Sequence, residues 1–251
     1  MNIDVSASNF LPASAPPPLR AGEVHVWSAW LDDSPSDACM LLSAAEWARA
    51  ARFQFESDCD KYIASRALVR SILGAYTGAA AKDLHFESGL HGKPELAGSM
   101  LRFNLSHSGD LLLLAVTYGR ELGIDVEEIR AGVSFEMLAD HYFTAEAAWQ
   151  LRLLSPEDRA ANFYDIWTRT EAQLKANGSG LANGTQVADP GRWTVLSLTP
   201  AEGYASALAV EGGSFQLQCC SWQNPNGRPA SAGPFFTDPR RAPKNSNLAA
   251  G

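Results

Sequence analysis

Features that mark membrane-spanning, disulfide-rich or nucleic-acid-binding proteins are scarce in this sequence. The longest apolar runs, such as residues 111–116, are far shorter than the roughly 20 residues that span a bilayer. Only 4 of the 251 residues are cysteines, and their positions, which include the adjacent pair Cys219 and Cys220, fit neither a disulfide framework nor metal-ligand spacing. The chain has 20 basic and 28 acidic residues, and its net charge of -8 argues against a protein that binds nucleic acid through many phosphates.

The remaining composition is typical of a globular protein. With 46% hydrophobic and 19% charged residues, a chain of this length can bury a core without disulfides or a structural metal. The N-terminus has no basic segment followed by an apolar run, so we expect no secretory signal and a cytoplasmic location. Residues 1–21 and 223–251 are rich in proline or small polar residues and lack apolar periodicity, which predicts disordered tails around an ordered body at 22–222.

Helix-like and strand-like segments are mixed along the ordered body without strict alternation, which predicts an α+β fold. Ser43 and Glu46 have the spacing of a capping box, and Gly78 and Gly178 are expected to end helices. The expected helices cover residues 43–53, 58–76 and 155–176, with a further helical block that begins near 134 and 144. The expected strands cover residues 24–28, 84–86, 101–103, 111–118, 122–127, 193–198, 205–210 and 215–222.

Two acidic residues lie two apart on the expected strand 122–127. Side chains two apart on a strand point to one face, so Asp125 and Glu127 present neighbouring carboxylates while Ile124 and Val126 point into the core. Like charges this close repel unless a cation lies between them, and oxygen ligands suit Mg²⁺ or Mn²⁺. A solvated strand end is the alternative interpretation, because the pair by itself is a weak signal.

The helix expected at 155–176 carries a second set of polar residues. Trp167, Glu171 and Lys175 are four residues apart and share one side of this helix. Glu171 could be a third metal ligand, and Lys175 a cation for a phosphate one turn further on. An ordinary surface ion pair between Glu171 and Lys175 is the alternative.

Three other groups of polar residues could bind an anion. Residues 103–109 include Asn, Ser, His and Ser, which we expect to form a loop between two apolar strands. A catalytic Ser–His pair is not expected there, because sequence neighbours point apart on an extended backbone. Lys93 lies in a turn after Gly92 and before Pro94, while Arg66 and Arg70 lie one helical turn apart. The alternatives are a turn with a chance histidine at 103–109, a simple turn at Lys93 and a solvated helix face at Arg66 and Arg70.

The order of these motifs resembles that of the 4′-phosphopantetheinyl transferase superfamily. The matching segments are 92–94, 103–108, 123–127 and 167–175, followed by 178–181. The resemblance covers roughly residues 22–222 and is to the long, surfactin-synthetase type. It implies a monomer of two similar α+β halves at 22–119 and 120–222, which are related by pseudo-twofold symmetry and have the active site at their interface.

The resemblance also implies a reaction and a set of site residues. 4′-Phosphopantetheine would be transferred from coenzyme A to a serine of an acyl or peptidyl carrier protein, with release of adenosine 3′,5′-bisphosphate. Asp125, Glu127 and Glu171 would bind Mg²⁺ or Mn²⁺, and the catalytic residues would be Asp125, Glu171 as the base for the serine proton, and Lys175 at the departing phosphate. The coenzyme A-binding residues implied by the resemblance are Arg49, Lys61, Arg66, Lys93, Pro94, Ser106 and His107.

Two positions depart from the pattern of this family. Thr170 stands where the family usually has lysine, and Glu46 stands where some relatives have lysine. A module that binds coenzyme A or a carrier without turnover is therefore a second hypothesis, and a different metal-dependent phosphoryl-transfer enzyme is a third. The sequence does not identify the carrier or its pathway, which could be fatty-acid, polyketide, nonribosomal-peptide or siderophore synthesis.

The family architecture also implies a carrier-docking face within residues 133–154. This segment is rich in apolar side chains, and we expect those to contribute more than charge, because the surrounding sequence is acidic. The expected contact residues are Phe135, Met137, Leu138, Tyr142 and Phe143.

Overall fold

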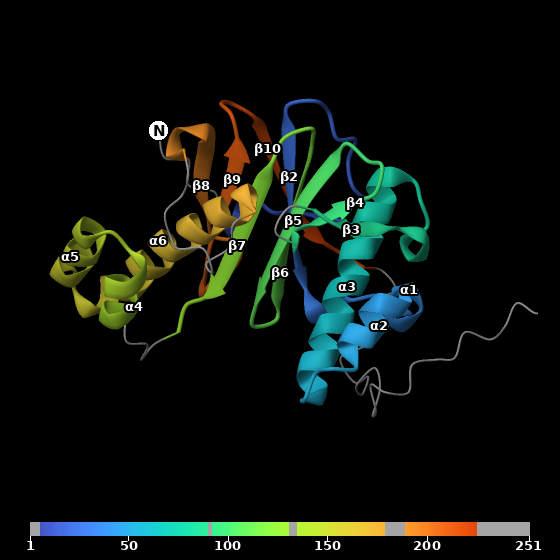
Figure 1. Ribbon diagram of the computed structural model, residues 1–251, viewed down its shortest axis with the longest axis horizontal. Coiled ribbons are helices and arrows are strands. Elements are labelled where there is room, and N and C mark those ends of the chain that lie inside the picture. Colours follow the sequence, from blue (N-terminus) through green and yellow to red (C-terminus); the bar gives the residue numbers. More distant parts are fainter. Residues whose placement is uncertain (1–5, 90–91, 131–134, 179–188, 225–251) are drawn as a thin grey trace, which may run out of the picture. The chain divides into compact units, whose positions relative to one another are not determined.

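The computed structural model describes residues 6–89, 92–130, 135–178 and 189–224. The chain divides into two compact units, of which the larger comprises residues 1–13, 17–29 and 85–222 and the smaller comprises 14–16, 30–84 and 223–251. Each unit is described by itself below. The helices and strands are labelled in Figure 1. None of the described helices is long and apolar enough to cross a membrane.

The larger unit contains a five-stranded sheet with the order β1-β10-β2-β6-β5. β1 and β2 each pair in parallel with β10, whereas β5 and β6 are antiparallel. The strands are β1 (Leu11–Ala13), β2 (Glu23–Trp30), β5 (Leu101–Ser108), β6 (Leu111–Tyr118) and β10 (Gln216–Trp222). All residues of β6 except the last are buried, as expected for an interior strand.

A second, three-stranded antiparallel sheet has the order β7-β9-β8 and is joined in the same unit by several helices. Its strands are β7 (Leu122–Glu128), β8 (Trp193–Leu198) and β9 (Tyr204–Glu211). The helices are α4 (Phe135–Tyr142), α5 (Ala145–Leu153) and α6 (Pro156–Asn177), and a short hairpin is formed by β3 (Phe86–Ser88) and β4 (Pro94–Leu96). Figure 1 shows α6 lying along β7 and β9.

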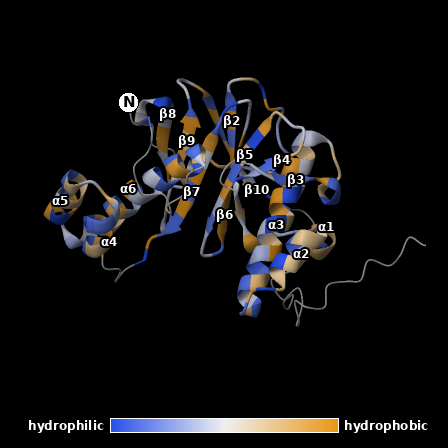
Figure 2. Ribbon diagram, in the orientation of Figure 1, coloured by the Kyte–Doolittle hydropathy of each residue, from blue (hydrophilic) through white to orange (hydrophobic). Residues whose placement is uncertain are grey.

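One hydrophobic cluster contains buried residues from both sheets. It includes Val24 and Leu113 of the five-stranded sheet together with Ile124, Val126 and Leu208 of the three-stranded sheet. Figure 2 shows hydrophobic residues concentrated along these strands. Because Ile124 and Val126 point into this core, Asp125 and Glu127 point to the opposite face of β7, which is the face that α6 covers.

Helix α6 approaches β7 most closely at Gly123. A Cβ atom at this position would lie 2.1 Å from the carbonyl oxygen of Ala172 and 2.4 Å from the amide nitrogen of Ala176. Real Cβ atoms essentially never come within 3.0 Å of another heavy atom, so only glycine allows this approach. Gly123 therefore determines how near the polar face of α6 comes to the acidic residues of β7.

The smaller unit is helical, with α1 (Ala38–Leu41), α2 (Ala44–Ala50) and α3 (Glu56–Thr77) around a core that includes Trp47 and Ile63. A second set of buried contacts, here called the Glu46 cluster, consists of Glu46, Arg66 and Arg70. Arg66 Nε donates to Glu46 Oε1 at 2.7 Å and Arg70 Nε donates to Oε2 at 2.8 Å. Arg70 also donates to the carbonyl oxygens of residues 81 and 84, so it ties α2, α3 and the following turn together.

The structure confirms the α+β class and many local predictions. Ser43 and Glu46 form the expected capping box, and Gly78 and Gly178 end α3 and α6 in the left-handed conformation. All four cysteines are free. The strands near 193–198, 205–210 and 215–222 form within two residues of the expected positions. Short 3₁₀ turns are also present at Ala7–Asn9, Leu31–Asp33, Ala81–Asp83 and Pro190–Arg192.

Three expectations differ from the structure. Residues 6–21 were expected in a disordered tail, but β1 pairs with β10 and Phe10 is buried, because a strand more than 200 residues further along the chain offers an edge. The loop expected at 103–109 is instead the continuation of β5, where the polar side chains have partners on β7. The strand expected at 84–86 lies at 86–88 and pairs with β4. Most of the expected tail at 223–251 lies outside the described residues.

Candidate active site

Side chains of β5 join the two sheets along a line of contacts with β7, here called the β5–β7 seam (residues 104–108 and 124–128). Asn104 Oδ1 accepts a hydrogen bond from the amide of Ile124 at 2.9 Å. Ser106 Oγ donates to Asp125 Oδ1 at 2.9 Å, and Ser108 Oγ donates to a Glu127 carboxylate oxygen at 2.9 Å. The three β5 residues alternate along the strand and therefore share one face. They hold the two acidic residues of β7 in register.

Asp125 is the most buried acidic residue of the seam, with 3% of its surface exposed. Its Oδ1 receives hydrogen bonds, whereas its Oδ2 is buried and has no hydrogen-bond partner within the part of the chain that the structure describes. Unpaired buried carboxylate oxygens are costly, and they are often explained by a ligand or ion that binds there.

Three carboxylates, here called the acidic cluster, interact with one another in this region: Asp125, Glu127 and Glu171. Burial raises the pKa of Glu127, with a further increase from Asp125, and the Ser108 hydrogen bond and the nearby cations only partly offset these effects. Burial also raises the pKa of Glu171, and the charges of Asp125 and Glu127 add to that increase. The acidic cluster is thus desolvated and carries excess negative charge.

Lys175 is the cation of α6 that contacts this cluster. Its Nζ donates to Asp125 Oδ1 at 2.6 Å and to Ser106 Oγ at 2.8 Å. The Lys175 side chain is 28% exposed, and that of Asp125 is 5% exposed. The sequence alternative of a surface pair between Glu171 and Lys175 is not what the structure contains, because Lys175 reaches across to β7.

The acidic cluster has the donor chemistry that a hard divalent cation requires. Its ligands would all be oxygens, and the buried Asp125 Oδ2 is an acceptor that no described residue contacts through a hydrogen bond. Among the described residues, no group of three or more His, Cys, Asp or Glu side chains already converges in the arrangement of a metal site. Repulsion between like charges is sufficient to keep such side chains apart. The residues fit Mg²⁺ or Mn²⁺ in type.

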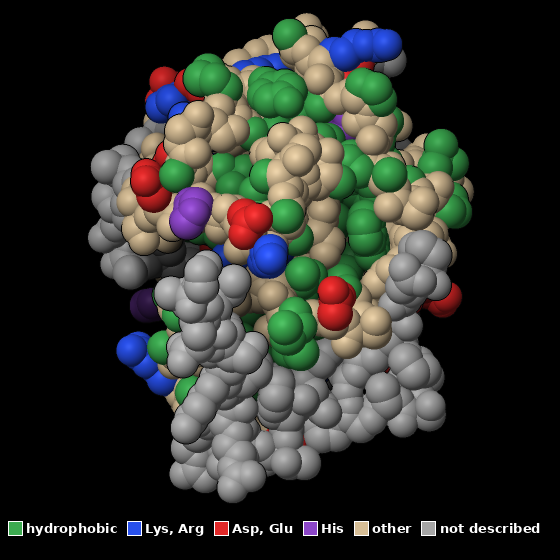
Figure 3. Space-filling view, turned by 90° about the vertical axis from the view of Figure 1, so that its right-hand side faces the viewer, with side chains coloured by type: hydrophobic (Ala, Val, Ile, Leu, Met, Phe, Trp, Pro, Cys, Tyr) green, Lys and Arg blue, Asp and Glu red, His purple; other side chains and the backbone are tan. Residues whose placement is uncertain are grey.

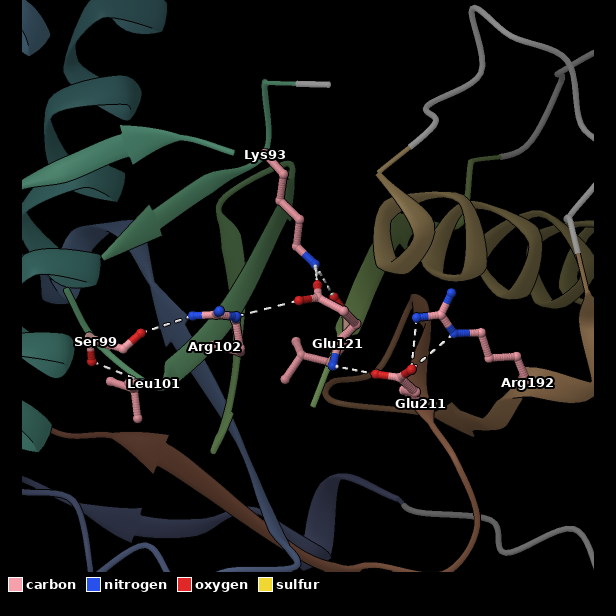
Figure 4. A network of polar contacts seen from close by, with 8 residues as sticks. Lys93, Ser99, Leu101, Arg102, Glu121, Arg192 and Glu211 are labelled. Carbon is pink, nitrogen blue, oxygen red and sulfur yellow. Dashed lines mark hydrogen bonds and ion pairs between the residues drawn. The ribbon is translucent and has the colours of Figure 1, made fainter. Parts of the chain in front are cut away.

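The other predicted site residues of the larger unit lie on or next to two strands. Ser106 and His107 are on β5, Lys93 directly precedes β4, and Pro94 begins β4. Ser106 lies beside Asp125, whereas His107, the next residue on β5, is exposed and points to the opposite face. Lys93 Nζ donates to Glu121 Oε2 and to the carbonyl oxygen of Leu122, both at 2.8 Å. Figure 4 shows this contact and the neighbouring ion pair of Arg192 with Glu211. Pro94 is the first residue of β4.

The other three predicted coenzyme A-binding residues belong to the smaller unit. Arg49 lines a pocket of about 500 Å³ together with Ala45, Arg52 and Phe53, and its guanidinium lies 5.6 Å from the centre of the Tyr62 ring. Lys61 is on α3, and Arg66 is paired with Glu46. The pocket therefore combines two cations with the ring of Phe53, which is a surface suited to an anionic ligand.

Sequence reasoning missed Asn104, Ser108 and Gly123 as residues that shape the site. The signal that could have found Asn104 and Ser108 is the alternation of polar residues at 104, 106 and 108, which is typical of a strand with one polar face. The role of Gly123 comes from the close approach of α6 and has no such local signal. Thr170 donates to the carbonyl oxygen of Ile166, and Arg169 donates to Ser197 on β8 at 3.0 Å. Arg169 therefore does not take the place of a lysine at position 170.

The expected docking face is partly buried. Phe135 is 8% exposed, and Leu138 and Phe143 pack against a cluster that includes Phe163, so these side chains stabilise α4, α5 and α6. Val133 lies outside the described residues. The large apolar side chains exposed on these helices are Met137 at 69%, Trp149 at 55% and Leu153 at 66%. Figure 3 shows a different face of the molecule from the one where these helices are labelled in Figure 1, and on it charged side chains of both signs lie singly or in small groups.

The sequence is similar to known proteins along most of its length. The family described as 4′-phosphopantetheinyl transferase, N-terminal, matches residues 26–118, and the 4′-phosphopantetheinyl transferase superfamily matches residues 121–232. The 4′-phosphopantetheinyl transferase HetI of Nostoc sp. is 37% identical over 217 residues, which are 79% of this chain and 92% of the relative. Psf-1 of Bacillus pumilus is 32% identical over 57% of this chain and 61% of its own length, and AcpT of Escherichia coli is 33% identical over 60% and 68%.

Proposed function

Because this chain belongs to the 4′-phosphopantetheinyl transferase superfamily and is an enzyme of that kind, we propose that it transfers 4′-phosphopantetheine from coenzyme A to a serine of an acyl or peptidyl carrier protein. The proposed reaction depends on Mg²⁺ and releases adenosine 3′,5′-bisphosphate. The observation that supports it best is the acidic cluster beside the β5–β7 seam, where Asp125 has one oxygen without a partner among the described residues and a lysine ammonium on the same carboxylate.

In the proposed reaction, the serine hydroxyl oxygen forms a bond to the phosphorus that carries pantetheine, and the bond from that phosphorus to the adenosine 3′,5′-bisphosphate oxygen breaks. Glu171 accepts the serine proton, directly or through a water molecule, and Lys175 stabilises the charge on the departing phosphate. Asp125, Glu127 and Glu171 would hold Mg²⁺ or Mn²⁺, which when bound offsets the negative charge of the diphosphate.

We further propose that Arg49, Lys61, Arg66, Lys93, Pro94, Ser106 and His107 bind coenzyme A. The cationic pocket at Arg49 and Arg52 supports a role in phosphate binding. Lys93 and Arg66 are paired with Glu121 and Glu46, so each would exchange a carboxylate for a phosphate when coenzyme A binds. His107 is exposed on the face of β5 opposite to Ser106, where it would contact a different part of coenzyme A.

The test is incubation with coenzyme A, Mg²⁺ and a panel of apo-carrier proteins, followed by mass spectrometry of the carriers. The wild-type protein should add the mass of phosphopantetheine, whereas Asp125→Ala and Glu171→Ala should reduce the rate by about 10³-fold or more. Glu128→Gln is the matched control, because Glu128 is a carboxylate of the same strand that lies on the surface beside Arg130. Undiminished modification by the Asp125 and Glu171 variants would refute the proposed site.

A second candidate function is binding of coenzyme A or a carrier without turnover, favoured by the neutral Thr170 one position before Glu171. Binding of coenzyme A without any modified carrier at saturating Mg²⁺ would support it. Failure to bind coenzyme A at all would instead favour another metal-dependent phosphoryl transfer. The panel also identifies the carrier and so its pathway. We propose that the protein is a cytoplasmic monomer. Size-exclusion chromatography with light scattering would check the monomeric state.

A further inference from the structure

The ion pair of Lys175 and Asp125 engages one carboxylate that the proposed function requires for the metal. Lys175 Nζ lies 2.6 Å from Asp125 Oδ1, and Ser106 Oγ contacts both groups at 2.8 and 2.9 Å. Oδ1 thus has two donors, while Oδ2 of the same carboxylate is buried and has none within the described residues. Oδ1 of this carboxylate therefore already interacts with a cation, and Oδ2 is left for a second cation.

The site contains more negatively charged than positively charged groups. The acidic cluster contributes three carboxylates, and Lys175 contributes one ammonium to the same group of interactions. With all four groups ionised, the formal charge is negative by two, which a divalent cation would balance and a second lysine would not. Ionic interactions between these groups are strengthened by their burial.

Lys175 is the longer and more exposed partner of the pair. It has a long flexible side chain that is 28% exposed, so its ammonium can move toward solvent. The Asp125 side chain is short and only 5% exposed. It projects from β7 and accepts a hydrogen bond from Ser106 Oγ. A divalent cation on Asp125 would repel the ammonium 2.6 Å from the same carboxylate, and Lys175 would move away.

We propose that Lys175 is an internal counter-ion that competes with the divalent cation for Asp125 and is released toward the phosphates of coenzyme A when the cation binds. This inference rests on the proposed function. It assigns Lys175 two alternating partners rather than one fixed position. Because coupling between two binding events is reciprocal, a phosphate that draws Lys175 away would also strengthen binding of the cation at Asp125.

The first test measures Mn²⁺ binding by electron paramagnetic resonance on the full chain without coenzyme A. Lys175→Met should bind Mn²⁺ roughly tenfold more tightly than the wild-type protein, within the usual range of coupling between sites. Arg130→Gln is the matched control, because Arg130 also interacts with Glu127 but is paired with the surface carboxylate of Glu128. Its Mn²⁺ affinity should change by no more than about twofold. Thermal unfolding of each variant checks that it is folded.

Equal or weaker Mn²⁺ binding by Lys175→Met would overturn the counter-ion role. An equal increase in Mn²⁺ affinity in Lys175→Met and Arg130→Gln would also overturn it, because the loss of any nearby positive charge would then explain the increase. If the wild-type protein and Lys175→Met both fail to bind Mn²⁺, and no carrier is modified, the proposed function itself fails. If the wild-type protein modifies a carrier but Lys175→Met binds Mn²⁺ no more tightly than the wild type, only the counter-ion proposal fails. The proposed function would then stand.

A second test follows the lysine directly. The ¹³Cε signal of Lys175, assigned by its loss in Lys175→Arg, should shift when Mg²⁺ is added to the protein without coenzyme A. The shift should follow the same saturation curve as metal binding. A signal that stays unchanged while Mg²⁺ saturates the protein would show that the ion pair persists and would overturn the proposal.

Discussion

Each compact unit of this chain contains a cluster of buried charge, and the two clusters are neutralised to different degrees. In the Glu46 cluster, both carboxylate oxygens accept from guanidinium groups, and the carboxylate also accepts from the amide of Ser43. In the acidic cluster, Asp125 leaves one buried oxygen without a partner among the described residues. The first arrangement stabilises the fold, whereas the second leaves an unsatisfied group that a ligand could stabilise.

The pKa values show the same difference. Burial alone would raise the pKa of Glu46, but the charges of Arg66 and Arg70 and the hydrogen bonds outweigh burial, and the net pKa is lowered. Burial raises the pKa of Glu127 and Glu171, and neighbouring carboxylates raise it further. Fully paired buried charge therefore favours the ionised form, and unbalanced buried charge opposes it.

The largest effect is expected from Arg70→Ala in the Glu46 cluster. The substitution leaves a buried carboxylate with one partner fewer and two carbonyl oxygens without their donor. We expect the free energy of unfolding to fall by about 3–5 kcal/mol, as for other broken buried ion pairs. Urea denaturation measures this. Lys82→Ala on the surface is the control, and a loss below about 1 kcal/mol for Arg70→Ala would contradict full pairing.

A smaller loss of stability is expected from Gly123→Ala in the larger unit. The new Cβ would lie 2.1 Å from a backbone oxygen of α6, so the helix must move away from the acidic residues of β7. We expect a destabilisation of about 1–3 kcal/mol, typical of overpacking, together with a loss of carrier modification. Gly213→Ala is the control, because its Cβ would meet open space. Wild-type activity in Gly123→Ala would show that the site does not depend on this approach.

Glu171→Gln is expected to raise the free energy of unfolding rather than lower it. Removing one carboxylate from a cluster with excess negative charge should raise the metal-free free energy of unfolding by roughly 0.5–1 kcal/mol, while activity is lost. Urea denaturation in chelator measures stability, with Glu128→Gln as the control. A destabilised Glu171→Gln would mean that the acidic cluster is a structural ion-pair network like the Glu46 cluster.

The smallest effect is confined to low pH. Because the pKa of Glu46 in the folded state lies below its ordinary value of 4.5, its ion pairs contribute their full stability above that pH and lose it as the pH falls through the folded pKa. The titratable and charged groups that interact with Glu46 include Arg66, Arg70 and Tyr62. The stability difference between wild type and Glu46→Gln should therefore shrink between pH 5 and pH 3. A constant difference would contradict this assignment.

Features that depend on neighbouring residues were predictable. The capping box at Ser43 and the ends of α3 and α6 at Gly78 and Gly178 follow from interactions within a few residues of each position. The placement of Asp125 and Glu127 on one face of a strand is equally local, because it follows from the alternation of side chains. The polar alternation at 104–108 is a local sign of a strand, but the partners of these residues were not predictable, since they lie on β7 about 20 residues further along the chain.

The sequence by itself determined the class of fold, the ends of the main helices and which residue types the site contains, because short-range periodicity and capping encode them. Only the tertiary structure decided that Lys175 pairs with Asp125 rather than with Glu171 and that Ser106 and Ser108 hold the acids of β7. It also decided that one oxygen of Asp125 is buried and has no partner in the part of the chain that the structure describes. The Lys175 contact depends on how closely α6 packs on β7 at Gly123, and the serine contacts depend on how β5 packs beside β7. Packing between distant segments leaves no local pattern.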